Sequence, residues 1–373
     1  MTEVLLTERI LEAAAGARGA VILLSPNPIR DTGGGQRSAQ IALELLEREL
    51  CVVFVAHGEV TETVDLGLRV THPRLIEVPL RQWIDDCQRA LSTLLRSTRT
   101  VGITQVPVRE WLPVLGRIHR GGGVTVFDLI DRWESELGGR WYSPRIERRT
   151  ARASDVLVAS APALVAHLTA LAGRPARLLP NAFNARVFRS GVSHPRPSDL
   201  PSVGPVVALY VGSLWGGWMD WSLVHRLATA LPELQLVFVG DHRGEGRGLP
   251  SNCHFLGLKA QGELPAYLAH AAVGFLPWKV DPVTQATSPL KVYECVAMGL
   301  PVIAPVLEPL EGIPGVEGVR GEDAFIAAVD RRAKALVPEE LRMAMHAFAS
   351  RNSWSARVDS LLEITGLASG RPE

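Results

Sequence analysis

The chain has 373 residues, 47% of them hydrophobic, and its 39 basic residues balance 39 acidic ones. This length exceeds what one compact core usually supports, so we expect two domains. Because there is no positive excess to displace counterions, the composition excludes nucleic acid as an expected partner. The most apolar window, 155–173, is interrupted by Pro162 and His167, so no membrane-spanning helix is predicted. The four cysteines form no CxxC pair, which favours a soluble protein of the reducing cytoplasm.

The first half of the chain alternates short apolar runs with longer helical patterns, which is typical of parallel β-α-β units. Between the first two runs, residues 36–50 carry apolar side chains that can cover one face of a sheet. We expect strands at 20–26, 51–57, 100–104, 124–130 and 155–160.

A proline-rich segment, 190–205, interrupts this rhythm and has no apolar periodicity, so we interpret it as a linker that follows an N-terminal domain at 1–189. The alternation then restarts and predicts a second α/β domain. Because open parallel sheets bind ligands at the carboxyl ends of their strands, the cleft between the domains is the expected site. The second set of strands is expected at 206–212, 234–240, 253–257, 273–278 and 301–305.

Gly33, Gly34 and Gly35 follow the first predicted strand and directly precede a helix. Consecutive glycines allow backbone N–H groups to approach a ligand closely, and a helix start adds partial positive charge. We therefore expect an anionic ligand at this loop. The loop matches neither GxGxxG nor a Walker sequence. A plain flexible turn between strand and helix is the alternative.

Two carboxylates follow the strand expected at 124–130. Asp128 lies at the strand end, where a side chain points toward the cleft and can accept hydrogen bonds from sugar hydroxyls or act as a base. Asp131, three residues on, could do the same, but the helix-capping interpretation is favoured for it.

Small and amide residues mark two further turns. Asn181 belongs to a Pro-Asn turn that its own side chain can close, and the turn interpretation is favoured there. Gly212 and Ser213 follow a strand and would permit close approach of a ligand. The tryptophans at 215, 218 and 221 could stack on a sugar, but core packing is favoured.

The segment 287–304 carries the most informative pair, Lys291 and Glu294. Ser288 and Pro289 precede a helix that ends at Gly299. A lysine in the first turn is unfavourable for the helix dipole, but it becomes understandable if an external anion meets the unpaired backbone N–H groups there. The alternative is a salt bridge between Lys291 and Glu294, which share a helix face.

With these residues in view, the chain resembles glycosyltransferase family four, whose members have the GT-B fold of two Rossmann-like domains facing a cleft. The resemblance covers nearly the whole length, and VFDLIDRWES and SLWGGWMDW look like the subgroup that acts on polysaccharide or cell-surface glycan precursors. It is carried by TGGGQRSA, DVLVASAPALVAHL, LLPNAFNARVF, YVGSL, LQLVFVG, FLGLKAQGELPAYLAHAAVGFLPW and SPLKVYECVAMGLPVIAP.

The resemblance implies a nucleotide-sugar domain at 206–350 and a final segment, 351–373, whose helix crosses back to the first domain. It assigns Glu294 to the ribose, and Gly33 to Gly35 to the diphosphate and the transferred sugar. The expected donor contacts beyond these are Ser288, Pro289, Leu290 and Lys291 at the diphosphate, Leu258 and Lys259 near the base, and Asn181, Gly212 and Ser213.

The chain departs from the family pattern at several positions. Ala286 stands where the first of two paired glutamates is usual. The basic residues common after the "VG" strand are replaced around Ser213 and Gly217. Ala182 and Asn184 stand where glycine and aspartate are common. We expect the Lys291 ammonium to supply the missing phosphate charge.

The expected function is therefore a retaining, metal-independent, hexosyltransferase-like enzyme without a cofactor. It would move a sugar from a nucleoside diphosphate sugar to a hydroxyl acceptor, which could be a glycan, a lipid-linked acceptor or a small molecule. Lys291 and Asp128 are the catalytic candidates. A nucleotide-sugar epimerase or hydrolase on the same scaffold and a noncatalytic partner subunit are the alternatives. Residues 145–152 could give peripheral membrane contact or form a solvated helix face.

Overall fold

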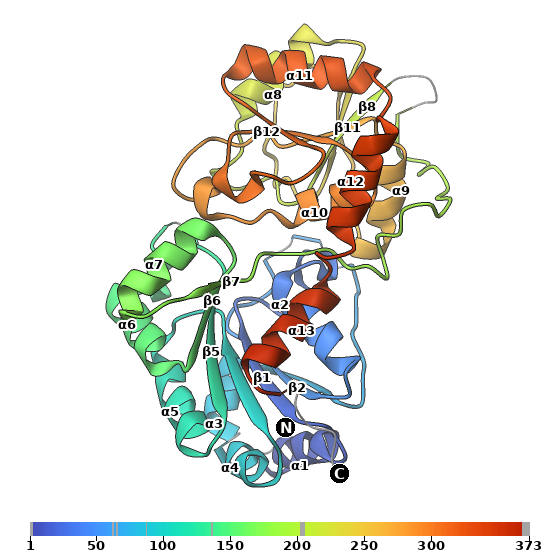
Figure 1. The fold of residues 1–373 in the computed structure, drawn as a ribbon. Coiled ribbons are helices and arrows are strands. Elements are labelled where there is room, and N and C mark those ends of the chain that lie inside the picture. Colours follow the sequence, from blue (N-terminus) through green and yellow to red (C-terminus); the bar gives the residue numbers. More distant parts are fainter. Residues whose placement is uncertain are drawn as a thin grey trace. The chain divides into compact units, whose positions relative to one another are not determined.

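The computed structural model describes residues 3–61, 63–64, 66–86, 88–135, 137–201 and 206–367. Contacts divide the chain into two compact units (Figure 1). The first unit holds Met1–Thr61, Arg69–Pro180 and Ser355–Glu373, and the second holds Glu62–Leu68 and Asn181–Trp354. Each unit contains one parallel sheet with helices packed against it, so the predicted α/β class is confirmed.

The sheet of the first unit has seven strands in the order β3-β2-β1-β4-β5-β6-β7, and every strand pair is parallel. Its central strands β1 and β2 are buried along their whole length, as continuous apolar runs predict for a sheet covered on both faces. The strands are β1 (Ala20–Ser25), β2 (Cys51–Ala56), β3 (Leu75–Pro79), β4 (Thr100–Thr104), β5 (Val124–Leu129), β6 (Val156–Ala159) and β7 (Arg177–Leu178).

Most helices of the first unit connect successive strands as in β-α-β units, whereas the first helix precedes β1 and the last comes from the end of the chain (Figure 1). The α-helices are α1 (Glu3–Ala14), α2 (Arg37–Leu46), α3 (Leu80–Asp86), α4 (Gln88–Ser97), α5 (Leu112–Arg120), α6 (Pro144–Ala153), α7 (Pro162–Ala172) and α13 (Trp354–Ile364). Short 3-10 helices are η1 (Asp31–Gly34), η2 (Arg109–Trp111) and η3 (Gly139–Trp141).

The second unit has a six-stranded parallel sheet in the order β10-β9-β8-β11-β12-β13. Its strands are β8 (Val207–Val211), β9 (Gln235–Val239), β10 (Cys253–Phe255), β11 (Val273–Phe275), β12 (Val302–Pro305) and β13 (Val316–Val319). Its helices are α8 (Trp221–Ala230), η4 (Gln261–Glu263), α9 (Leu264–Ala269), η5 (Thr284–Ala286), α10 (Leu290–Ala297), η6 (Glu308–Leu310), α11 (Glu322–Lys334) and α12 (Glu339–Ala349).

All ten predicted strands are present, but three others were not predicted: β3, β7 and β13. Each lies at the edge of its sheet, where one side of the strand is not covered by a neighbour. They are partly exposed, so they lack the continuous buried apolar run that identifies a central strand.

The compact units differ from the predicted boundaries, because the chain changes unit at Pro180 and not at 189. Phe183, Phe188 and Leu200 belong to the core of the second unit. Phe183 also accepts a backbone hydrogen bond from Trp354, just before the chain returns to the first unit at Ser355. Most of the expected linker therefore packs on the second unit, while 202–205 and the final residues 368–373 lie outside the described residues.

Each sheet reverses its strand order beside its first strand. In the first unit β1 lies between β2 and β4, and in the second β8 lies between β9 and β11. Connections leave such a pair of strands toward opposite faces, so space for a ligand opens beyond their carboxyl ends. The Gly33–Gly35 loop follows β1, and Gly212 follows β8.

No helix in the described residues is both long enough and apolar enough to cross a bilayer.

The backbone beside β8 requires glycine at position 240. Gly240 has a φ of +155°, and a Cβ there would lie 2.0 Å from the carbonyl oxygen of Gly212. We expect Gly240→Ala to lower the free energy of unfolding by about 2–3 kcal/mol in urea denaturation. Gly262→Ala is the matched control, since a Cβ at Gly262 meets nothing within 4 Å. Equal stability of the two variants would contradict this role.

Candidate functional site

Lys291 is held at the switch point of the second sheet by Tyr210 of β8. Its Nζ donates a hydrogen bond of 2.9 Å to the Tyr210 hydroxyl. That hydroxyl also accepts from Nε1 of Trp278 at 3.3 Å and donates to the carbonyl oxygen of Ser213 at 3.1 Å. The ammonium lies 4.4 Å from the ring centroid of Tyr210 and 4.9 Å from that of Trp278, within the range of cation–π attraction.

The same lysine lies directly against the backbone of Gly212. A Cβ at Gly212 would be 2.6 Å from Nζ of Lys291, so the predicted close approach at this glycine is made by the chain's own lysine. Among the described residues Lys291 forms no ion pair with Glu294 or another acid, so the alternative of a Lys291–Glu294 salt bridge is wrong. The ammonium is half-buried among neutral partners.

Helix α10 begins beside this lysine with no acidic residue in its first turn. Pro289 is the N-cap residue and provides no side-chain acceptor, and Leu290 is the first helical residue. The N–H groups of the first turn therefore gain no acceptor from a cap, and their partial positive charge adds to that of Lys291. The region is suited to an anion.

Ser288 and Asn181 meet at the turn before α10, although they lie far apart in the sequence. The backbone N–H of Asn181 donates to Oγ of Ser288 at 3.2 Å, and Nδ2 of Asn181 donates to the carbonyl oxygen of Ser288 at 2.6 Å. Oγ of Ser288 also lies 3.4 Å from the hydroxyl of Tyr293. Asn181 thus fixes the entry to α10, a role that its own local turn did not predict.

Glu294 is a buried carboxyl group on α10, with 6% of its surface exposed. Among the described residues it accepts one hydrogen bond, from Nε2 of Gln261 at 3.3 Å. Burial raises the pKa of Glu294 to about 7, against the opposing effects of the Gln261 hydrogen bond and the Lys291 charge. The carboxyl group can accept hydrogen bonds from hydroxyl groups that enter beside α10.

Leu258 and Lys259, the residues expected near the base, lie three and two residues before Gln261, whose side chain bonds to Glu294. Lys259, however, is engaged elsewhere, because its Nζ forms an ion pair of 2.7 Å with Asp199. Asp199 also accepts from the hydroxyl of Tyr267 at 2.9 Å. The contact of Leu258 and Lys259 with a nucleotide stays a prediction.

Two cations contact the loop after β8, where the sequence pattern had indicated that basic residues were missing. Nζ of Lys279 donates to the carbonyl oxygen of Gly217 at 2.9 Å. The guanidinium of Arg243 lies 3.8 Å from the ring centroid of Trp215 and pairs with Asp241 at 3.2 Å. Sequence reasoning missed both because they come from other loops.

The tryptophans of this loop bear out core packing at two of three positions. Trp218 and Trp221 pack against the core of the second unit, and Trp221 contacts Phe238 and Phe255. Trp215 lies between Trp218 and Arg243 at the edge of the core.

In the first unit Gly33 and Gly34 lie in η1 with φ of +67° and +80°, and Gly35 follows them. The carbonyl oxygen of Gly34 accepts a hydrogen bond of 2.8 Å from Nε2 of Gln40, which ties the loop to the first turn of α2. The predicted contact of these glycines with a donor stays a prediction.

Asp128 is held in a buried ion pair with Arg37, the first residue of α2. Nη2 and Nε of Arg37 donate to its two carboxylate oxygens at 2.8 and 2.9 Å, and Nε2 of Gln105 donates at 2.8 Å. Both side chains are at most 3% exposed. Asp128 could act as a base only if this pair opened, so its geometry is that of a residue that positions Arg37 and the loop before it.

Asp131 lies in the loop after β5, and no described helix begins beside it, so the helix-capping interpretation is wrong. Burial raises its pKa to about 7, against the opposing charge of Arg37. Its side chain forms no hydrogen bond with another described residue and is partly exposed. Asp131 lies at the same edge of the sheet as Asp128, but its oxygens accept no hydrogen bond from a described side chain, whereas those of Asp128 accept three.

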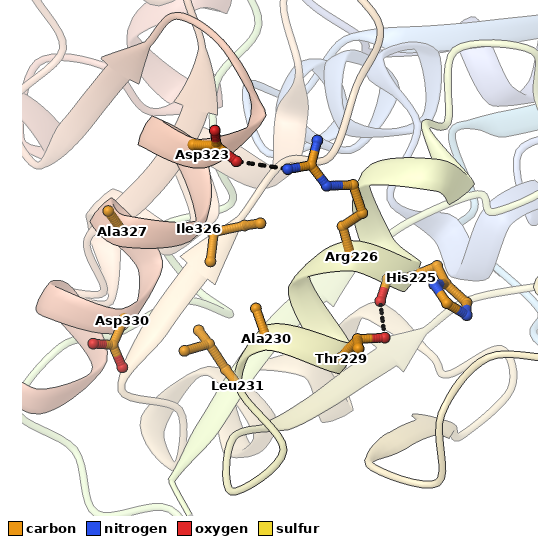
Figure 2. Close-up of a pocket in the computed structure, with 9 residues that line it drawn as sticks. All are labelled: His225, Arg226, Thr229, Ala230, Leu231, Asp323, Ile326, Ala327 and Asp330. Atoms are coloured by element: carbon orange, nitrogen blue, oxygen red, sulfur yellow. Dashed lines mark hydrogen bonds and ion pairs between the residues drawn. The ribbon is translucent and has the colours of Figure 1, made fainter.

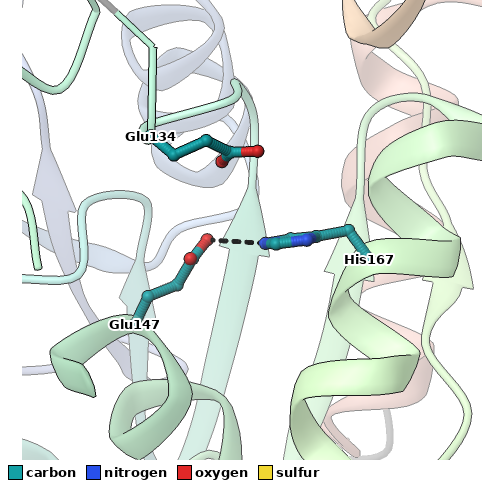
Figure 3. Close-up of side chains that lie close together, drawn as sticks. All are labelled: Glu134, Glu147 and His167. Atoms are coloured by element: carbon teal, nitrogen blue, oxygen red, sulfur yellow. Dashed lines mark hydrogen bonds and ion pairs between the residues drawn. The ribbon is translucent and has the colours of Figure 1, made fainter. Parts of the chain in front are cut away.

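A separate polar cluster in the first unit joins Glu134, Glu147 and His167 (Figure 3), whose ligand atoms lie within 4.8 Å of one another. Nε2 of His167 lies 3.3 Å from Glu147, which also accepts from the hydroxyl of Tyr142 at 2.8 Å. Glu134 pairs with Arg132. The hydrogen bond to Glu147 raises the pKa of His167. These internal partners explain the cluster without a ligand.

An open cavity of about 570 Å³ lies between α8 and α11 (Figure 2). Arg226 on its rim pairs with Asp323 at 2.6 Å. Thr229 and Leu231, which also line it, lie at the end of α8. Its lining comes from α8 and α11 and includes none of the site residues described above.

The raised pKa of Glu294 predicts a pH-dependent stability. Below pH 4.5 its carboxyl group is neutral in both the folded and unfolded chain, whereas above about pH 7 folding must bury a charge. We expect Glu294→Gln to raise the free energy of unfolding by about 2 kcal/mol above pH 7 and to change it little below pH 4.5, as measured in urea. The exposed Glu263→Gln is the control. A pH-independent effect of Glu294→Gln would contradict the assignment.

Comparison with known proteins places this geometry in context. Residues 205–339 match the family described as "Glycosyl transferases group 1". A Bacillus subtilis (strain 168) protein that is named as a teichuronic acid biosynthesis glycosyltransferase, TuaH, is 23% identical over 279 residues, which is 68% of this chain and 70% of that protein.

Solved glycosyltransferase structures align with nearly the whole chain. Sucrose-phosphate synthase from Thermosynechococcus elongatus covers 93% of this chain and 98% of its own, with a TM-score of 0.64 and 16% identity. Anabaena HepE in complex with UDP and glucose covers 93% and 99%, with a TM-score of 0.66 and 13% identity. The predicted GT-B fold is confirmed, and the segment that matches the group 1 family lies within the second unit.

Proposed function

We propose that this protein transfers a sugar from a nucleoside diphosphate sugar to a hydroxyl acceptor, in the biosynthesis of a polysaccharide or other glycan. The observation that carries the proposal is the Lys291 ammonium, which lies among neutral partners at the switch point and beside an acid-free helix start. The group 1 match and the TuaH likeness support a glycosyltransferase. HepE was solved with UDP-glucose, which supports a nucleotide sugar as the donor.

The chemistry that this site can supply is electrostatic. As the bond from the sugar to the diphosphate breaks, negative charge grows on the leaving phosphate, and preorganised donors aimed at it lower the barrier. We assign that role to Lys291 and the first-turn amides of α10. Lys279, which donates to Gly217 in the loop after β8, can add positive charge, whereas the charge of Arg243 is paired with Asp241. The proposal includes retention of configuration, hexose transfer and independence of a metal, as the family-four resemblance implies.

The remainder of the donor would lie along α10. Glu294 is assigned to the ribose hydroxyls, because its buried carboxyl group accepts only one hydrogen bond, from Gln261, among the described residues. Gly212 and Ser213 offer backbone next to Lys291. Ser288 and Asn181 fix the turn that aims the helix start.

Asp131 is the better carboxyl group for an acceptor hydroxyl than Asp128. A base needs a free oxygen and a pKa near the working pH, and Asp131 has both features, while Arg37 and Gln105 occupy the oxygens of Asp128. We therefore expect Asp131→Asn to lower acceptor-dependent turnover while donor binding is kept.

One observation keeps other functions in consideration. Ala286 is buried, with 1% exposure, at the position where the resemblance implies a glutamate that contacts the donor sugar. A noncatalytic partner subunit, or an epimerase or hydrolase, would follow if the missing contact prevents transfer. Analysis of products with and without acceptor extract separates these functions, because only a transferase needs the acceptor and a noncatalytic subunit yields no product.

Lys291→Met provides the test of the proposed chemistry. A thermal-shift screen of nucleoside diphosphate sugars first identifies the donor, since ligand that binds only the folded state raises its stability. We expect Lys291→Met to lower release of nucleoside diphosphate from that donor by at least ~100-fold, because a charged group at the leaving phosphate is lost.

The matched control is Lys334→Met, which removes a surface lysine that pairs with Asp330 at the end of α11. It should keep the wild-type rate. A Lys291→Met enzyme with the wild-type rate would overturn the assignment of this lysine.

A further inference from the structure

Helix α6 carries a row of exposed arginines whose positive charge is not balanced by an acidic residue on the same face. Arg145, Arg148, Arg149 and Arg152 are spaced i, i+3, i+4 and i+7, so they share one face of the helix. All four are exposed. The single acid of α6, Glu147, lies on the opposite, buried face and is bonded to Tyr142 and His167.

Helix α5 packs beside α6 (Figure 1) and carries further exposed arginines. Its exposed side carries Arg117 and Arg120. We call these two residues and the four arginines of α6 the arginine face. The acid beside it, Asp155, lies 2.8 Å from Nδ1 of His119 and accepts a hydrogen bond from the hydroxyl of Thr125.

Within the described residues, no member of the arginine face forms an ion pair. Like charges at i, i+3 and i, i+4 destabilise a helix by about 0.2–0.5 kcal/mol per pair. Arg145 also lies in the first turn, where the helix dipole disfavours a cation. Within the helix, only Glu147 in the first turn and the place of Arg152 in the last turn offset these charges, whereas an external anionic surface would meet the whole face.

We propose that the arginine face docks the protein on a membrane rich in anionic lipid headgroups. Guanidinium groups bind phosphate through paired N–H donors, and each one near an anionic bilayer adds about 1 kcal/mol of binding free energy. The chain has no net charge, so the positive charge of the arginine face is a local feature and not a property of the whole chain. A planar bilayer contacts only such a side, whereas a nucleic acid partner is typical of a domain that is basic as a whole.

The experiment is co-sedimentation of the full chain with vesicles of phosphatidylcholine and phosphatidylglycerol in equal amounts, and with vesicles of phosphatidylcholine alone. We expect binding only to the anionic vesicles, and weaker binding as salt is added. The variant Arg145→Gln/Arg148→Gln/Arg149→Gln/Arg152→Gln should bind at least ~100-fold more weakly. The corresponding Arg→Lys variant should retain most of the binding.

The matched control changes four exposed arginines elsewhere: Arg81, Arg189, Arg320 and Arg351, each to Gln. It has the same net charge as the α6 variant and should bind like the wild type. Thermal unfolding verifies that each variant is folded. Equal binding of the two Gln variants, or binding of wild type to neutral vesicles, would overturn the proposal. So would failure to bind anionic vesicles together with arginine-dependent binding to a DNA duplex.

Discussion

The hydrogen bond between Lys291 and the Tyr210 hydroxyl is the contact on which the candidate site depends. It holds a positive charge against the faces of Tyr210 and Trp278 and over the backbone of Gly212, where acidic partners are absent among the described residues. A lysine paired with an acid would be neutralised before a ligand arrived. Because its partners here are neutral, the charge stays available at the point where the strand order reverses and a helix begins.

The first unit shows the opposite arrangement at the corresponding strand edge. Arg37 follows the glycine loop, but Asp128 neutralises its charge in a buried, bidentate ion pair. That pair fixes the start of α2, and it leaves Asp131 as the carboxyl group without a described partner. The two sheets therefore share a topology but differ in chemistry: the edge of one carries a cation that pairs with no described acid, and the edge of the other carries a carboxyl group that bonds to no described residue.

The sequence was sufficient for the central strands, because buried parallel strands are continuous apolar runs. It also singled out Lys291, because a cation in an acid-free first turn is locally unfavourable, and the contact of this lysine with an anion stays a prediction. It was insufficient where the decisive contact is distant. The ion pair between Arg37 and Asp128 was not predicted. The contacts of Lys279 and Arg243 with the loop after β8 were not predicted either. The unit boundary at Pro180 likewise depends on where Phe183, Phe188 and Leu200 are buried, which only the fold decides.

The most direct test compares calorimetric affinities for a nucleoside and its diphosphate in the wild type and in Lys291→Met. If the ammonium meets the diphosphate, wild type prefers the diphosphate, and the substitution reduces that preference by ~10- to 100-fold while nucleoside affinity is unchanged. An unchanged preference for the diphosphate in Lys291→Met would contradict the account.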